Sequence, residues 1–186
     1  MPLNITEFKG ALTGDGARPN MFQVTIDNPV SQLGNFKTPF LVKVAEIPAA
    51  TIGEIQLFYQ GRPVKYAGDR TFADWTVTII NDEDFIVRDA MERWNNAING
   101  FRTNARDPGF VLAANYKSNA TVTQLSKTGI PLRTYAFQGI FPKEISNIAL
   151  DWGGNDTIEE FTVTFSVDLW EVGQGTIGQV TAPLFN

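Results

Sequence analysis

The chain has 186 residues, a formal net charge of −5, and neither histidine nor cysteine. Without these residue types it has no Ser-His-Asp or Cys-His nucleophile, no imidazole or thiolate metal ligand, and no disulfide. We therefore expect no catalytic, cofactor or metal site. Any remaining catalysis would have to use carboxylates, lysine or tyrosine.

Apolar residues make up 43% of the chain and charged residues 19%, which is typical of one globular domain with a sizeable core. The charge is uneven, because residues 143–186 contain one lysine and seven carboxylates. This acidic quarter is either a solvated surface or a face that meets a basic partner or repels a polyanion. No apolar run reaches about 18 residues and the start lacks a signal-peptide pattern, so we expect no membrane insertion.

The chain begins with an arm, residues 1–17, in which glycines interrupt any regular pattern. Alternating apolar and polar side chains then predict strands at 22–26 and 40–47. Residues 52–66 predict a hairpin around the turn Gln60-Gly61-Arg62-Pro63, because glycine beside proline is typical of turns.

The predicted hairpin is unusually aromatic for its length. Such side chains either pack a core or cover another chain, so Phe58, Tyr59 and Arg62 are candidate inter-subunit contacts. The following Gly68-Asp69-Arg70 predicts a polar turn. Asp69 and Arg70 are expected to form an ion pair there, inside one subunit or between two.

A strand is predicted at 74–80 and the one helix at 82–98. Asn81 or Asp82 is expected to cap that helix, and Asn99-Gly100 to end it. The acidic run Asp82-Glu83-Asp84 suits the positive end of the helix dipole and lacks the spacing of a metal-binding loop. The apolar stripe of the helix comprises Val87, Ala90, Met91, Trp94 and Ile98.

After an irregular stretch, alternation predicts four further strands, at 120–125, 132–141, 144–150 and 160–169. Residues 172–186 then form a C-terminal extension rich in glycine and proline. This extension contains glycines at dinucleotide-fingerprint spacing, but no βαβ unit surrounds them. Strands with short connections and one flanking α-helix predict a mainly β fold, an antiparallel β-sandwich or partly closed barrel.

The polar faces of the strands are rich in threonine and contain no lysine or arginine, which suits either an ordinary solvent-facing sheet or the wall of a conduit for DNA. Basic side chains would grip phosphates and slow the passage of DNA. One such face is Gln23, Thr25 and Asp27 of the first strand, and Asp74 begins another. The candidate lumen face consists of Thr76, Thr78, Glu160, Thr162, Thr164, Ser166 and Asp168.

Several motifs in a fixed order resemble the tail tube proteins of contractile-tailed (myovirus) bacteriophages. The most specific is the segment GDRTF-DWTVT within 67–78. The chain departs from the family pattern at both ends and around 99–114. The other matching motifs are Ala17–Val24, Tyr116–Ser118, Gly139–Pro142, Leu150–Trp152 and Asp168–Glu171.

The resemblance implies a structural protein that catalyses nothing. Six copies would form a ring, their strands would complete a continuous inner β-barrel, and the rings would stack into the inner tube of the tail. The implied partners are the tail sheath, baseplate and tail terminator proteins, the tape-measure protein, and genomic DNA in transient, non-specific passage. The implied location is the virion tail, assembled in the host cytoplasm.

Two alternatives remain open at the level of the sequence. A tube protein of a non-phage contractile injection or type VI secretion system would share the fold but pass protein cargo. A monomeric β-sandwich that binds a ligand would need an aromatic platform and would not associate. Open sheet edges favour assembly, because an uncovered edge is an aggregation hazard in a monomer.

Overall fold

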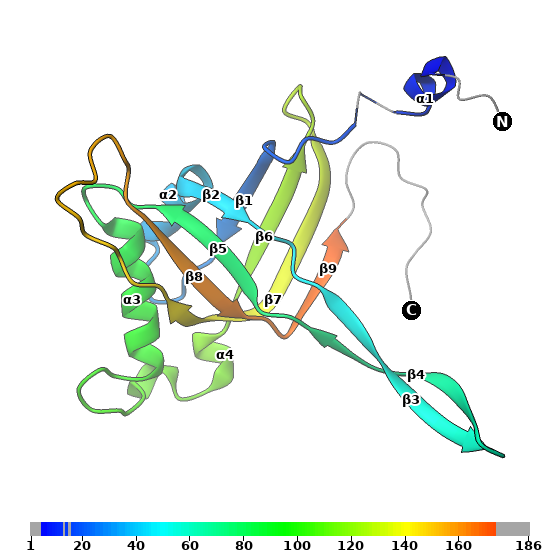
Figure 1. The fold of residues 1–186 in the computed structure, drawn as a ribbon. Coiled ribbons are helices and arrows are strands. Elements are labelled where there is room, and N and C mark those ends of the chain that lie inside the picture. Colours follow the sequence, from blue (N-terminus) through cyan, green and yellow to red (C-terminus); the bar gives the residue numbers. More distant parts are fainter. Residues whose placement is uncertain (1–4, 13, 15, 174–186) are drawn as a thin grey trace.

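The computed structural model describes residues 5–12, 14 and 16–173, and these form a mainly antiparallel β fold (Figure 1). The described helices are α1 (Ile5–Ala11), α2 (Leu33–Leu41), α3 (Ile86–Ile98) and α4 (Ala113–Tyr116), with a 3₁₀ turn at Pro108–Phe110. The described strands are β1 (Phe22–Ile26), β2 (Val42–Ala45), β3 (Ala50–Tyr59), β4 (Arg62–Phe72), β5 (Trp75–Ile80), β6 (Ser118–Leu125), β7 (Pro131–Ile145), β8 (Glu160–Ser166) and β9 (Leu169–Gly173).

The strands form two layers that share β7, a strand of 15 residues. The first part of β7 lies between β6 and β9, and its last part pairs with β8. Gly139, which has a φ of 68°, lies where the strand passes from one layer to the other. The sheet order is β1-β6-β7-β8-β5-β2, with β9 beside β7. The predicted antiparallel sandwich or partly closed barrel is confirmed, and the sheet does not close, since β1 and β2 end it.

The hydrophobic core fills the space between the two layers. Trp75, Val77 and Ile79 of β5 are fully buried, and each faces an apolar residue of β8 in register. The Trp75 ring stacks on Phe137 of β7 with centroids 4.5 Å apart, which joins one layer to the other. The alternation predicted along these strands therefore has a direct cause in the two-residue period of a half-buried sheet.

Helix α3 packs against the sheet with the predicted stripe, and Trp94 at its centre donates a hydrogen bond from Nε1 to the Tyr116 carbonyl at 2.7 Å. The predicted start at Asp82 is wrong, because α3 begins at Ile86 after Phe85 in a left-handed conformation. The carboxylates of Asp82 and Asp84 bind Lys37 of α2, and Asp84 also accepts a hydrogen bond from the backbone amide of Ile86 at 3.1 Å, so the acidic run fixes the turn that leads into the helix.

The predicted strand at 40–47 is wrong over its first residues, which belong to α2. Gly34 lies so close to α3 that a Cβ there would come within 2.9 Å of the Ala90 Cβ. The Thr38 hydroxyl donates to the Gly34 carbonyl, so α2 satisfies its own polar group while buried against α3. Packing on a neighbouring helix thus overrides a local pattern that contains Pro39. The single flanking helix that we expected is accompanied by α2 and α4. The arm 1–17, in which we expected no regular pattern, contains α1 at Ile5–Ala11.

Two later strand boundaries also differ from the prediction. The strand predicted at 144–150 is wrong, because β7 continues to Ile145 and residues 146–159 form the loop to β8. The strand predicted at 160–169 is two strands, since β8 ends at Ser166 and β9 begins at Leu169. β9 extends two residues into the predicted extension 172–186, and residues 174–186 lie outside the described part of the chain.

Candidate assembly surface

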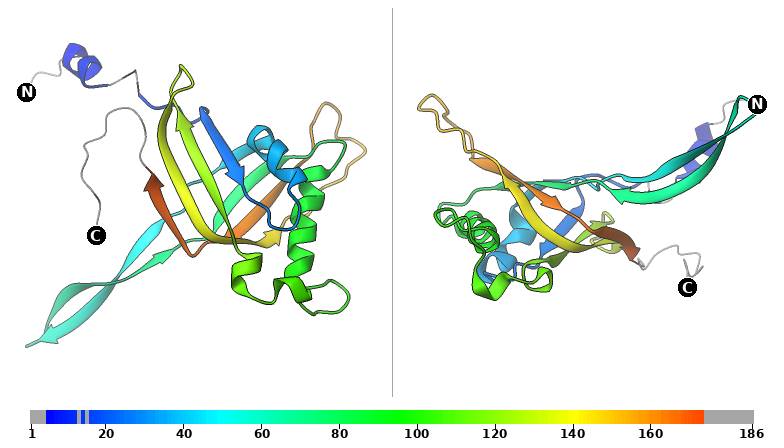
Figure 2. Two further views of the ribbon diagram at one scale, coloured as in Figure 1. Left: turned by 180° about the vertical axis from the view of Figure 1, so that it is seen from behind. Right: turned by 90° about the horizontal axis from the view of Figure 1, so that it is seen from below.

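The hairpin of β3 and β4 projects from the body of the protein (Figures 1 and 2). Its turn is Gln60-Gly61, and both residues have positive φ, as a two-residue hairpin turn requires. The predicted turn was two residues too long, because Arg62 and Pro63 already belong to β4.

One face of this hairpin is apolar. In the antiparallel register Ile55 pairs with Tyr66 and Leu57 with Val64, so these four side chains lie on the same face. All four are exposed. Exposed apolar side chains that lie together in this way make this face a candidate interaction surface.

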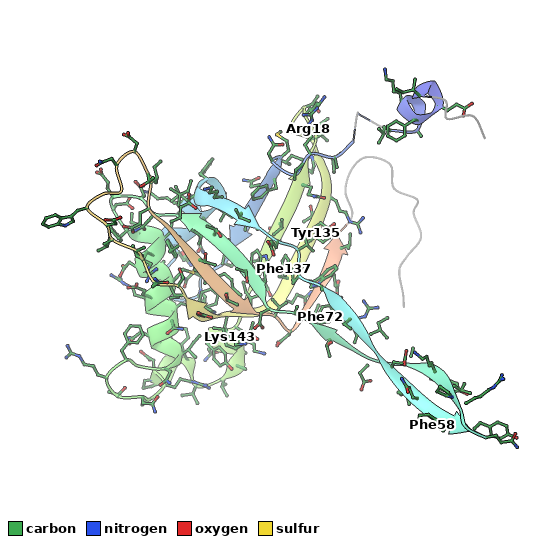
Figure 3. All side chains as sticks on the ribbon, viewed as in Figure 1. Arg18, Phe58, Phe72, Tyr135, Phe137 and Lys143 are labelled. Carbon is green, nitrogen blue, oxygen red and sulfur yellow. The ribbon has the colours of Figure 1, made fainter. Side chains whose placement is uncertain are left out.

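The tip carries the candidate contacts Phe58, Tyr59 and Arg62, and Figure 3 shows Phe58 at the far end of the hairpin. The exposed fractions of Phe58 and Tyr59 are 72% and 70%. These two aromatic side chains therefore bury little of their surface within the subunit. Their apolar surface is available to another molecule.

The predicted turn at Gly68-Asp69-Arg70 is wrong, because all three residues lie within β4. Asp69 and Arg70 are adjacent in a strand and therefore point to opposite faces, so they do not pair with each other. Both are exposed, and neither has an ion-pair partner among the described residues. The register shifts at this point, where a Cβ added at Gly68 would lie only 3.1 Å from the carbonyl carbon of Gly53 in β3.

The structure brings six of the seven candidate lumen residues onto one face of β5 and β8. Thr76 pairs with Thr164 and Thr78 with Thr162, and the last two hydroxyl oxygens are 3.4 Å apart. All are half-buried, opposite the core side of the same strands. The six residues are Thr76, Thr78, Glu160, Thr162, Thr164 and Ser166.

Asp168 does not belong to this row. It follows the end of β8, and both of its carboxylate oxygens accept hydrogen bonds from Lys117 at 2.6 and 2.7 Å. The strict alternation of residues 160–169 suggested one strand, but the chain turns after Ser166 so that β9 can pair with β7.

Two lysines border the polar face, and each binds a carboxylate. Lys43 lies 2.6 Å from Glu160, and Lys143 lies 2.7 Å from Asp74. The hydrogen bond to Asp74 raises the pKa of Lys143 above its ordinary value. Both cations are therefore already paired at the edge of a face that itself carries hydroxyl groups.

A second threonine-rich face covers the outside of the other layer, and sequence reasoning found only its first strand. Thr25 of β1 pairs with Thr121 of β6, and the Thr123 and Thr134 hydroxyl oxygens lie 3.3 Å apart across β6 and β7. The polar positions of 120–125 and 132–138 would have indicated the rest of this face, had the register of the strands been known.

Strands β1 and β2 end the seven-stranded sheet, and neither has a strand on its outer side in the described part of the chain. They are short, with five and four residues. On α2, beside β2, Phe36 and Phe40 are exposed. Open strand edges next to exposed aromatic rings are able to bind further strands.

The acidic run before α3 links that helix to α2 through ion pairs. The Lys37 ammonium binds both Asp82 and Asp84, and these bonds raise the pKa of Lys37. The hydrogen bond from Lys37, followed by that from the Ile86 amide, holds the pKa of Asp84 below its ordinary value.

No group of three or more potential metal ligands occurs among the residues that the structure describes. In the same residues, no helix has the length and apolar character needed to cross a membrane.

Comparison with known proteins gives consistent matches. A model of the family described as phage tail tube protein matches residues 17–173. The tail tube protein gp19 of Enterobacteria phage T4 is 36% identical over 160 residues, which cover 86% of this chain and 93% of that protein. The tail tube protein of Serratia phage KSP90 is 26% identical over 163 residues, or 85% of this chain and 90% of that one.

Solved structures show the same fold at much lower identity. The tube-terminating cap of the anti-feeding prophage has a TM-score of 0.65 at 16% identity, covering 95% of this chain and all of that chain (100%). A chain of the sheath–tube complex of an extracellular contractile injection system has a TM-score of 0.56 at 14% identity, with coverages of 93% and 99%.

Proposed function

Since the chain belongs to the phage tail tube protein family, we propose that six copies close into a ring and that stacked rings form the inner tube of a contractile tail. The observation that carries this proposal is the projecting hairpin, whose apolar and aromatic side chains have no role inside the subunit. The resemblance seen in the sequence motifs is confirmed by the family match.

Ring closure would complete the sheet. β1 and β2 offer unpaired edges at the two ends of the strand order, so identical copies can pair edge to edge. A head-to-tail contact of this kind gives a ring when its rotation closes. The inner strands of six copies would then make a continuous β-barrel.

In this ring the face of Thr76, Thr78, Thr162 and Thr164 would line the lumen. Hydroxyl groups and paired lysines leave few free cations to bind phosphates, and each such contact would add affinity for DNA. The tape-measure protein would occupy the lumen first, and genomic DNA would pass through it later.

The hairpin would make the contacts between subunits. Phe58, Tyr59 and Arg62 would contribute at its tip, and Asp69 and Arg70 near its base. Since Asp69 and Arg70 point to opposite faces, each is available to a partner on another copy.

The other partners follow from the position of the tube. We expect its outer face to meet the sheath protein and its ends to meet the baseplate and terminator proteins. The product would be a structural component of the virion tail, assembled in the host cytoplasm and without catalytic activity. Residues 1–186 would act as one tube domain with the arm 1–17 and the extension 172–186.

The phage assignment is favoured over a non-phage injection system by the distribution of identities. The phage T4 protein is 36% identical, whereas the injection-system chain with the same fold is 14% identical.

Electron microscopy and native mass spectrometry of the purified protein test the proposal. Six-copy rings and tubes with a central hole are expected. The Asp69→Lys variant should keep the circular dichroism of the wild type but assemble poorly. A compact monomer at every concentration would refute the proposal, and normal tubes from Asp69→Lys would remove Asp69 from the contact.

A further inference from the structure

We propose that the hairpin tip of one copy docks on the β7–β8 loop, residues 146–159, of a copy in the next ring. This inference rests on the proposed function and adds the receiving surface for the hairpin. The exposed apolar side chains of this loop belong neither to the core of the subunit nor to the proposed lumen face.

The β7–β8 loop exposes apolar side chains. Leu150 and Ile158 are largely exposed, and Trp152 is fully exposed. A hollow of about 380 Å³ in this loop is lined in part by Leu150, Asp151 and Ile158. An exposed tryptophan in a loop with further exposed apolar side chains is typical of a protein–protein contact.

The loop has a defined backbone. The Asp151 carboxylate accepts a hydrogen bond from the Gly153 amide at 2.9 Å, and the Gly154 amide donates to the Asp151 carbonyl at 3.1 Å. At its end, the Asn81 amide donates to the Glu159 carbonyl at 2.8 Å. The apolar side chains are therefore presented by a turn that is tied to the end of β5.

The loop and the hairpin lie at opposite ends of the same strands. β4 leads into β5 at Trp75, so the hairpin leaves the sheet at that end of β5. The other end of β5 is Ile80, which pairs with Glu160 directly after the loop. Figures 1 and 2 show the hairpin and the loop on opposite sides of the body. Repeated head-to-tail stacking therefore brings each tip toward the loop of the next copy.

The two surfaces have opposite charges. The tip carries Arg62, which has no ion-pair partner among the described residues, whereas Lys65, farther along β4, pairs with Glu54 of the same hairpin at 3.0 Å. The loop carries Asp151, Asp156 and Glu159, and residues 146–159 contain no lysine or arginine. Aromatic side chains at the tip can bury themselves against the apolar loop while these charges fix the orientation.

Cysteine crosslinking tests this contact, because the chain has no cysteine of its own. The Tyr59→Cys, Trp152→Cys double variant is assembled and treated with a short bifunctional maleimide. A ladder of crosslinked chains is expected, since each copy would join the next. The matched control replaces Trp152→Cys with Phe101→Cys, an exposed ring on a different loop, and should give no ladder.

The outcomes separate this inference from the proposed function. Tubes that form without the Tyr59–Trp152 crosslink, or with an equal ladder in the control, would overturn the docking but leave the tube intact. Failure of the unsubstituted protein to form rings or tubes would overturn the proposed function itself.

The Trp152→Ser variant gives a second readout that does not depend on crosslinking. Its fold should be unchanged because the Trp152 side chain is fully exposed in the subunit. Rings should persist, whereas tube growth should require at least about tenfold more protein, as for loss of a hot-spot residue. Normal tubes that fail to bind sheath protein would place the loop on the outer surface and contradict the proposal.

Discussion

At the scale of single residues, Gly139 is the position where the shared strand β7 depends most on the absence of a side chain. Its φ is 68°, and a Cβ there would lie within 2.6 Å of Asp168 Cγ. Gly139→Ala should lower the free energy of unfolding by about 1–2 kcal/mol from backbone strain, with a further loss as Asp168 is displaced from Lys117. Urea unfolding of the unpolymerised subunit measures this change.

The matched control is Gly129→Ala. Its φ is 79°, but nothing lies within 4 Å of the added Cβ, so only the backbone strain applies. Equal losses in the two variants would show that the contact with Asp168 does not contribute.

The ion pairs of Lys37 with the turn before α3 predict how the pKa of Asp84 responds to a substitution. The pKa of Asp84 is low mainly because Lys37 donates to its carboxylate. Its stabilising contribution is therefore present above the ordinary Asp pKa and is lost as the pH falls through the lowered folded value. Lys37→Met should raise the Asp84 pKa toward its ordinary value, measured by carboxyl-carbon NMR. Lys43→Met, whose partner is Glu160, should leave it unchanged; an unchanged pKa in Lys37→Met would contradict this cause.

At the scale of the elements, the contact between the layers predicts which core residue matters most. Phe137 is fully buried and stacks on Trp75, so Phe137→Ala should cost about 3–5 kcal/mol of unfolding free energy. Phe36→Ala removes the same side chain from an exposed position on α2 and should change subunit stability little. Similar losses of unfolding free energy in the two variants would show that the stacking between the layers does not contribute more than an exposed phenylalanine.

The two threonine faces can be told apart by adding a cation to each. Thr164→Arg lies on the proposed lumen face, so its tubes should retain DNA at low salt and release it as salt rises. Thr25→Arg on the outside of the other layer should form tubes that retain no DNA inside. The result is read by nuclease protection of labelled DNA, and the reverse pattern would place the lumen on the β1–β6 face.

An element was predictable from the sequence when residues within its own segment determine it, and not when contacts with distant residues do. The alternation of β5 and β8 and the stripe of α3 depend on burial of one face, which a pattern records directly. α2 depends on Gly34 lying against Ala90, a contact 56 positions apart in sequence that no local pattern contains. β4 extends through Gly68-Asp69-Arg70 because β3 supplies a partner, although the residues themselves favour a turn.

The sequence indicated which side chains are candidates for contact with another copy, but not how they are arranged. The aromatic excess at 58–59 left core packing and contact with another chain open, and the structure excludes the core of the subunit because both rings lie exposed at the hairpin tip. The exclusion of Asp168 from the polar row required the turn after Ser166, which the continued alternation of the sequence conceals. The β7–β8 loop was missed because its side chains have no periodicity.

At the scale of the whole molecule, amide hydrogen exchange tests most directly whether the subunit leaves its surfaces for other copies to cover. A two-stranded hairpin alone is marginally stable, so β3 and β4 should exchange rapidly in the dilute subunit. In the assembled protein, residues 50–72 and the edge strand β2 should become strongly protected, while β5 and β8 change little. Equal protection of the hairpin and of β2 in the dilute and concentrated protein would contradict the account.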